Sequence, residues 1–225
     1  MATESEARIS DAVQDYAKAI YSLHGRSEEA VPTSAIADRL GVSAASSSAM
    51  LKRLESLGLV KREPYHGVEL TPAGERVALE VIRHHRLLEL YLAEALGMSW
   101  DRVHEEAEVL EHAISPELSE LIAEKLGNPT HDPHGDPIPT VGGEIEEGRT
   151  RSLAELAAGE RGVFTRVSDS DPEMLRYLSA RGIERGAIIE IAGREPFGGP
   201  VTVRVEGREH ALGDRLACAM RVDPA

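Results

Sequence analysis

The stretch TSAIADRLGVSAASSSAMLKRLESL, residues 33–57, decides how the first part of this chain folds. Within it, the spacing Ala37-x-x-x-Gly41-Val42 is typical of a helix-turn-helix. The small side chain at position 37 lets two helices approach, and glycine permits the tight turn between them. Ser43 is a good N-cap for the second helix, and Gly58 is a good end for it. We therefore expect helices over residues 33–40 and 43–57.

The flanking sequence extends this motif to a winged helix-turn-helix. Upstream, residues 10–24 place apolar side chains on one face of a helix. Downstream, residues 59–62 and 68–71 read as two short strands around a turn at 64–67. This order of helices and hairpin predicts a winged-helix domain over residues 1–72.

The second helix of the motif carries side chains that suit DNA. Small hydroxyl and methyl groups near its start fit thymine methyls and water-mediated contacts in the major groove; these are Ser43, Ser46, Ser47 and Ala49. Groups that suit phosphates follow on the helix and the wing: Lys52, Arg53, Lys61, Arg62, Tyr65 and His66. Winged helices also serve as scaffolds or protein-interaction domains, but the hydroxyl-rich helix start and the basic wing favour double-stranded DNA as the partner.

The charge distribution supports this interpretation although the chain is acidic overall. A net charge of −14 would normally argue against nucleic acid. Basic side chains nevertheless outnumber acidic ones in residues 38–62, and the balance reverses strongly in residues 84–150. An acidic middle segment attracts cations and repels DNA until its charge is neutralised.

The apolar runs, the first residues and the cysteine content predict a cytoplasmic protein with no membrane partner. No apolar run approaches the ~20 residues needed to span a bilayer, and the first residues lack a basic segment followed by an apolar one. The single cysteine, Cys218, excludes an internal disulfide and fits a reducing compartment. Because Cys218 lies in an alternating, strand-like run, we expect it to be buried.

The rest of the chain divides into a helical segment and a β-rich segment. Helices are expected from Pro72 to about Leu96, over 100–113 and over 116–126, followed by the loop HDPHGDPIP at 131–139. Residues 141–150 resemble a linker. Beyond them, 163–167, 188–191, 201–205 and 217–222 read as strands, and a short helix follows the N-cap Asp171. The fold class is therefore mainly α, with a helical domain over 73–140 and a small SH3-like β-barrel over 151–225.

The helical segment carries side chains with metal-ligand spacing. In the run VHEEAEVLEHA, His104, Glu108, Glu111 and His112 stand at i, i+4, i+7 and i+8, within one quadrant of a helix. One helix earlier, His85 and Glu89 repeat the i, i+4 spacing. Imidazoles and carboxylates on one face are typical ligands of divalent metals. A face with several carboxylates and no counterion would be costly to bury.

Several neighbouring side chains have simpler interpretations. His85 and Glu89 alone could form a surface i, i+4 pair. We expect solvated positions for His84, Glu105 and Glu106. Within the Pro/Gly loop, we expect polar side chains to cap turns: His131, Asp132, His134 and Asp136.

The order of these motifs resembles the diphtheria-toxin-repressor family of metal-dependent transcription regulators. The resemblance rests on the winged helix, then HHRLLELYL, VHEEAEVLEHA and HGDPIP, then a small β domain of FeoA-like type, and it covers nearly the whole chain. It implies a primary metal site of Asp15, Glu108, Glu111 and His112. It also implies an ancillary site of His85, Glu89 and His104, with Asp171 and Glu173 as donors from the β domain. By the same resemblance, residues 73–140 supply metal binding and dimerisation, so the protein is expected to be a homodimer.

The ligand types predict which metal is sensed. Iron-selective members of the family have Met and Cys where this chain has Asp15 and Glu108, and hard carboxylates favour Mn²⁺. Short manganese regulators of the family place a second carboxylate one turn after the first, where this chain has Lys18. We therefore expect two separate sites instead of a bridged two-metal site. Mn²⁺ is the expected corepressor, with Fe²⁺ as the alternative.

Other function classes remain open at this point. A metalloenzyme such as a two-metal hydrolase also uses Asp, Glu and His, but no general acid or phosphate-binding glycine loop accompanies the cluster. A winged-helix regulator that senses an organic effector would bind DNA regardless of Mn²⁺. The prediction is a metal-dependent repressor that controls manganese homeostasis and is not an enzyme.

Overall fold

The computed structural model describes residues 9–25, 29–63, 67–146 and 148–224. It divides into two compact units, which we describe separately. Unit 1 contains the chain up to His84 together with residues 111–114 and 139–144. Unit 2 contains residues 85–110, 115–138 and 145 to the end. In the described part of the chain, no helix is both long enough and apolar enough to cross a membrane.

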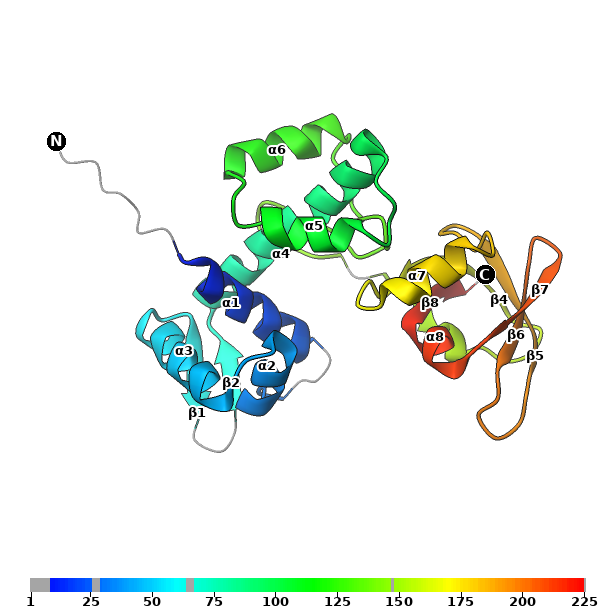
Figure 1. Ribbon diagram of the computed structural model, residues 1–225, viewed down its shortest axis with the longest axis horizontal. Coiled ribbons are helices and arrows are strands. Elements are labelled where there is room, and N and C mark those ends of the chain that lie inside the picture. Colours follow the sequence, from blue (N-terminus) through cyan, green and yellow to red (C-terminus); the bar gives the residue numbers. More distant parts are fainter. Residues whose placement is uncertain (1–8, 26–28, 64–66, 147, 225) are drawn as a thin grey trace. The chain divides into compact units, whose positions relative to one another are not determined.

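Unit 1 contains the winged helix, as predicted from the sequence (Figure 1). Its elements are α1 (Asp11–His24), α2 (Thr33–Leu40), α3 (Ala44–Ser56), β1 (Val60–Glu63), β2 (Gly67–Leu70) and the start of α4 (Pro72–Leu96). Gly41 adopts the left-handed φ of 64° that the turn between α2 and α3 requires. The Ser43 hydroxyl caps α3 by accepting a hydrogen bond from the amide of Ser46 at 3.1 Å. One apolar core joins α1 to α3 and the wing, with Val13, Ile20, Leu51, Leu54 and Val60 among its members.

The helical part of unit 2 contains the remainder of α4, then α5 (Val103–Leu110) and α6 (Pro116–Lys125). Helix α5 is shorter than the predicted 100–113, so Glu111 and His112 lie in the turn after it. Residues 111–114 connect α5 to α6, which Ser115 caps with extended backbone, and Pro116 disfavours helical backbone in the residue before it.

The β-rich part of unit 2 is a six-stranded antiparallel sheet of order β3-β8-β4-β5-β6-β7. Its strands are β3 (Arg151–Ser152), β4 (Arg161–Val167), β5 (Ile188–Arg194), β6 (Val201–Val205), β7 (Arg208–Leu212) and β8 (Met220–Pro224). Its helical elements are η1 (Leu153–Glu155), α7 (Pro172–Ser179) and α8 (Asp214–Ala219). A continuous apolar core lies inside it, with Phe164, Leu178, Ile189 and Val203 fully buried.

Two sequence-based expectations for this domain are wrong. Residues 217–219 belong to α8 and not to a strand, and the last strand begins at Met220. Cys218 is exposed and not buried. In the helix, Leu216 and Ala217 take the buried face, and this turns the next side chain toward solvent.

Candidate metal centres

The first candidate centre, the α1 cluster, consists of Asp15, Glu111 and His112 in unit 1. Each offers one donor atom, and the three atoms lie within 4.8 Å of one another. His112 Nε2 is 2.9 Å from Asp15 Oδ1 and 3.5 Å from Glu111 Oε1. On the other side of the ring, Nδ1 is 2.6 Å from Gln14 Oε1. Because that oxygen can only accept, Nδ1 is the donor and Nε2 is left to face the carboxylates, as a metal-binding imidazole requires.

Lys18 also reaches the α1 cluster. Its Nζ lies 2.9 Å and 2.7 Å from the two carboxylate oxygens of Glu111. The Glu111 side chain is 0% exposed, and the Lys18 side chain is 17% exposed. The buried carboxylate thus has a cationic partner without any bound metal.

The second candidate centre, the α4 cluster, consists of His85, Glu89, His104 and Asp169 in unit 2. Glu89 Oε1 lies 3.0 Å from His85 Nε2 and 3.2 Å from His104 Nδ1. The same nitrogen of His104 is 3.0 Å from Asp169 Oδ2. Helix α4 supplies the first pair at i, i+4, α5 supplies His104, and the segment between β4 and α7 supplies the aspartate.

The β-domain carboxylate that lies in the α4 cluster is that of Asp169, whereas the sequence predicted Asp171 and Glu173 as donors. Asp171 has other partners, because it caps α7 through the Glu173 amide and pairs with Arg215 at 2.9 Å. The Glu173 side chain is exposed. Neither residue joins a candidate metal group in the part of the chain that the structure describes. Position in the sequence could not separate these carboxylates, because SDSDPEM offers three within five residues.

A buried extension of the α4 cluster was not predicted. Glu89, Asp132 and His134 are buried, and their donor atoms also lie within 4.8 Å of one another. Asp132 does order its loop as expected, since Oδ1 accepts the amides of His134 at 2.9 Å and Asp136 at 2.8 Å. It also faces the two other side chains.

The His134 ring indicates what this buried extension can hold. Nε2 donates to the Trp100 carbonyl at 2.7 Å, so Nδ1 is the remaining ring nitrogen. Nδ1 lies 3.8 Å from Glu89 Oε2, and both atoms are buried without a hydrogen-bond partner. A neutral imidazole would point a lone pair at a carboxylate, which is unfavourable unless a proton or a metal ion lies between them. The donor set therefore fits a cation.

Protons take the place of that cation in the metal-free protein. Burial lowers the pKa of His104, but Asp169 and Glu89 outweigh it and raise the pKa to about 10. For His134, burial is likewise outweighed by Glu89, and the pKa rises to about 9. Burial alone would raise the pKa of Glu89, yet its histidine neighbours hold that pKa well below the usual range. Burial and the carboxylates of Asp136 and Glu89 raise the pKa of Asp132 to about 8.

The position of Glu108 adds a carboxylate beside the α4 cluster. Its Oε1 lies 3.8 Å from His85 Nδ1 and 3.8 Å from His104 Nε2, and its side chain is 44% exposed. Its membership of the primary site with Asp15 stays a prediction. His84, expected to be solvated, is buried, and burial lowers its pKa.

The structure also places the α3 side chains that the sequence predicts to face DNA. Ser43, Ser46 and Ala49 are exposed near the helix start, as are the basic residues Lys52 and Arg53 further along. Arg62 is partly exposed on β1, 3.8 Å from Glu55. The prediction that Ser47 faces DNA is wrong, because this side chain is 0% exposed and cannot reach a base from inside the domain. Tyr65 and His66 lie outside the described residues.

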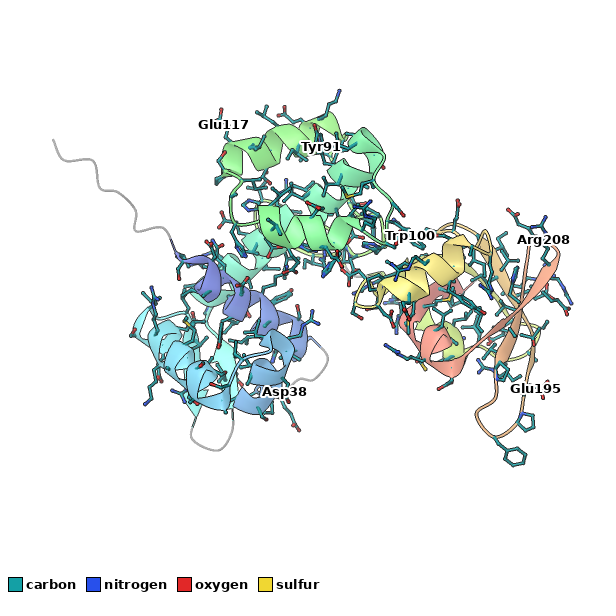
Figure 2. All side chains as sticks on the ribbon, viewed as in Figure 1. Asp38, Tyr91, Trp100, Glu117, Glu195 and Arg208 are labelled. Carbon is teal, nitrogen blue, oxygen red and sulfur yellow. The ribbon has the colours of Figure 1, made fainter. Side chains whose placement is uncertain are left out.

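In unit 2, a hydrogen bond of Trp100 connects the segment before α5 to the β domain. Figure 2 labels Trp100, whose indole nitrogen donates a hydrogen bond to the Ser179 hydroxyl of α7 at 2.7 Å.

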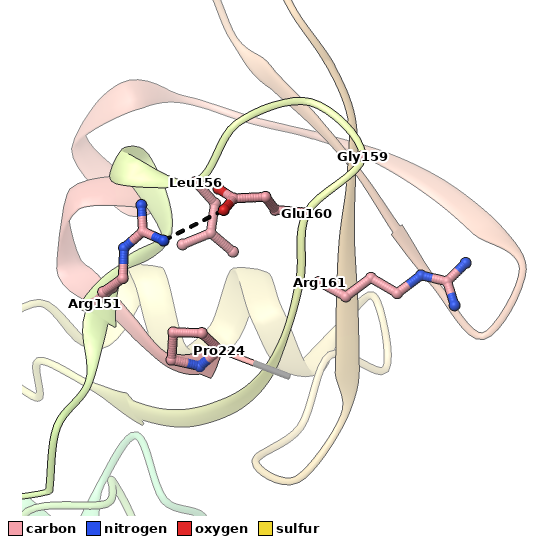
Figure 3. A pocket seen from close by; sticks show the side chains of 6 residues that line it. All are labelled: Arg151, Leu156, Gly159, Glu160, Arg161 and Pro224. Carbon is pink, nitrogen blue, oxygen red and sulfur yellow. Dashed lines mark hydrogen bonds and ion pairs between the residues drawn. The ribbon is translucent and has the colours of Figure 1, made fainter.

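Figure 3 shows a hollow of about 320 Å³ on the β domain, lined by Arg151, Leu156, Gly159, Glu160, Arg161 and Pro224. Its Arg151–Glu160 ion pair spans 3.4 Å. None of these lining residues belongs to the metal clusters.

Comparison with protein families divides the chain into three consecutive parts. Residues 8–68 match the N-terminal DNA binding domain of iron dependent repressors. Residues 71–140 match the metal binding and dimerisation domain of iron dependent repressors. Residues 151–224 match the FeoA domain.

Similar proteins cover nearly the whole chain. The diphtheria toxin repressor of Corynebacterium glutamicum is 32% identical over 95% of this chain and 96% of its own length. The iron-dependent repressor IdeR of Mycobacterium bovis is 31% identical over 95% of this chain and 97% of its own length. Among solved structures, a manganese-dependent transcriptional repressor in complex with manganese is 41% identical. It covers 95% of this chain and 100% of its own, with a TM-score of 0.88. The structure of ScaR with bound Zn²⁺ is 30% identical, covers 95% of this chain and 99% of its own, and has a TM-score of 0.80.

Proposed function

The chain belongs to the diphtheria toxin repressor family of metal-dependent, DNA-binding transcriptional repressors, and on that premise we propose that Mn²⁺ is its corepressor. The genes it controls would then be those of manganese homeostasis. Because some relatives are named iron-dependent repressors, Fe²⁺ is the alternative corepressor.

The donor atoms of the α1 cluster are the observation that carries this proposal. They are two carboxylate oxygens and one imidazole nitrogen, without sulfur. Oxygen-rich sets favour hard ions such as Mn²⁺, whereas thiolate and thioether ligands favour softer ones. The similar structure that contains manganese agrees with this assignment. Glu108, close to Glu111 in the sequence, is proposed as a further carboxylate of this primary site.

The packing of α1 explains how a metal would change DNA binding. Asp15 lies on α1, and α1 shares its apolar core with the recognition helix α3 through Ile20, Leu51 and Leu54. A divalent ion would supply the positive charge that holds Asp15 to Glu111 and His112. That tie fixes α1, and the shared core passes the constraint on to α3.

We further propose the partners and roles of the other parts. Two copies would form a homodimer whose α3 helices read half-sites of a double-stranded operator. Ser43, Ser46 and Ala49 would face base edges, and Lys52, Arg53 and Arg62 would contact phosphates. The β domain would be an SH3-like barrel that lends Asp169 to the ancillary α4 cluster. The protein would act in the cytoplasm and would not be an enzyme.

Fluorescence anisotropy with DNA from upstream of the protein's own gene tests the proposal. Mn²⁺, anaerobic Fe²⁺ and Zn²⁺ are titrated against wild type, Asp15→Ala and the control Glu105→Ala, whose side chain is exposed. We expect Mn²⁺-dependent binding in wild type and Glu105→Ala, reduced at least tenfold in Asp15→Ala. Equal binding with chelator and with Mn²⁺ would contradict the corepressor role and favour an organic effector. Activation by Fe²⁺ at lower free concentration than Mn²⁺ would favour the iron alternative.

A further inference from the structure

Lys18 is a cation built into the α1 cluster. It lies one helical turn after Asp15, and its ammonium group contacts both oxygens of Glu111 at 2.9 Å and 2.7 Å. The carboxylate it contacts is completely buried. This contact therefore belongs to the interior of unit 1 and is not an exposed surface ion pair, which would be worth little.

The electrostatic consequence follows from the charges present. A buried carboxylate without a cation is costly, so Lys18 stabilises Glu111 when no metal is bound. The ammonium of Lys18 therefore offsets carboxylate charge inside the cluster, and it does so at the oxygens of Glu111 that a metal ion would use. A metal ion that binds Glu111 must share this carboxylate with the ammonium, or displace it.

We propose that Lys18 is the tethered counter-cation of the α1 cluster, which restricts the cluster to one divalent ion and weakens the binding of that ion. This inference rests on the proposed function and deepens it. A second ion beside Glu111 would meet the ammonium at a few ångströms, and position 18 provides no carboxylate to hold it. Lys18 thus raises the metal concentration at which the protein responds.

Three substitutions separate this role from a purely structural one. Lys18→Met removes the charge while keeping an unbranched side chain, and Lys18→Glu adds a carboxylate. Lys125→Met is the matched control, because Lys125 is exposed at the end of α6. Mn²⁺ affinity and the number of ions per chain are measured by equilibrium dialysis and electron paramagnetic resonance, and metal-free stability by thermal unfolding.

The proposal predicts a gain of affinity together with a loss of metal-free stability. Removing one unit charge about 5 Å from a divalent ion is worth about tenfold in affinity even at a water-like dielectric constant, so Lys18→Met should bind Mn²⁺ about tenfold more tightly. Its midpoint of unfolding should fall without metal and recover with Mn²⁺. Lys18→Glu should bind one additional ion per chain, with a spin-coupled spectrum. Lys125→Met should match wild type.

The opposite outcomes overturn the proposal. A structural role for Lys18 predicts weaker Mn²⁺ binding in Lys18→Met and an unchanged ion count in Lys18→Glu. If Lys18→Met does not unfold cooperatively, the ion count of Lys18→Glu decides alone. Failure of the proposed function looks different, because wild type itself would then show DNA binding indifferent to Mn²⁺.

Discussion

The carboxylate of Glu89 is surrounded by three histidines of unit 2. Its Oε1 contacts His85 and His104, and its Oε2 faces His134 at 3.8 Å. Burial disfavours the charged form of this carboxylate, and the three rings, which carry positive charge when protonated, outweigh that effect. A metal ion at this position therefore competes with protons and does not enter a neutral site.

This competition predicts that Mn²⁺ binding releases protons. The pKa of His104 is raised to about 10 and that of His134 to about 9, so both rings are protonated at pH 7.5 in the metal-free protein. Ligation needs neutral imidazole, so affinity should increase as pH rises toward 9–10. Calorimetry at pH 7.5 in two buffers of different ionisation enthalpy measures the protons released. Glu89→Gln should release fewer, because it removes the carboxylate that raises both pKa values. Identical heats in both buffers for wild type would contradict the prediction.

At the scale of elements, the loop between α6 and the linker is fixed against strand β4. The carbonyl of His134 accepts the amide of Val167 at 3.0 Å, and Arg166 pairs with Asp136. Gly135 has a φ of +93°, and a Cβ there would lie 2.0 Å from the Thr165 carbonyl oxygen. The loop thus depends on glycine for both its backbone conformation and its close approach to β4.

We therefore expect Gly135→Ala to reduce the free energy of unfolding by about 2 kcal/mol or more. The strained φ and the clash with backbone act together, and neither is relieved by a side-chain movement. Gly142→Ala is the control, because its Cβ would meet only the Thr140 hydroxyl at 3.6 Å. Urea unfolding measures both variants. Equal stability of the two would show that the loop can leave β4 without cost.

The elements also show what the sequence could and could not predict. The helix-turn-helix was predictable because Gly41 and Ser43 act locally on the turn and on the N-cap. The end of α5 was missed because the helical spacing of the potential ligands continues past Leu110 through Glu111 and His112. Asp169 was missed because its role depends on how the β domain folds onto His104, which no local pattern encodes. Ser47 was misassigned because a hydroxyl suggested exposure at a position that is buried.

At the scale of the whole molecule, the chain is acidic, but α3, the helix that we propose reads DNA, carries basic side chains. The net charge is −14, yet the exposed side chains of α3 include Lys52 and Arg53. DNA affinity should therefore depend steeply on the few phosphate contacts that this helix and the wing provide.

Lys52→Ala should weaken Mn²⁺-dependent DNA binding by a similar factor on every operator variant. It should also reduce the slope of log affinity against log salt by about 1, as expected for one lost phosphate contact. Anisotropy titrations at four salt concentrations measure this slope, with Lys125→Ala as the control. A loss of affinity confined to particular base substitutions would instead assign Lys52 to base recognition.

His85 and Asp169 belong to one cluster although residues 86–168 separate them along the chain. An ion held by both closes that long loop as a reversible cross-link would, and an unfolded chain offers no such set of ligands. Each increase in free metal then lowers the fraction of chains open to proteolysis. We expect the lifetime of this repressor in the cell, and so its abundance, to follow the supply of the ion it senses.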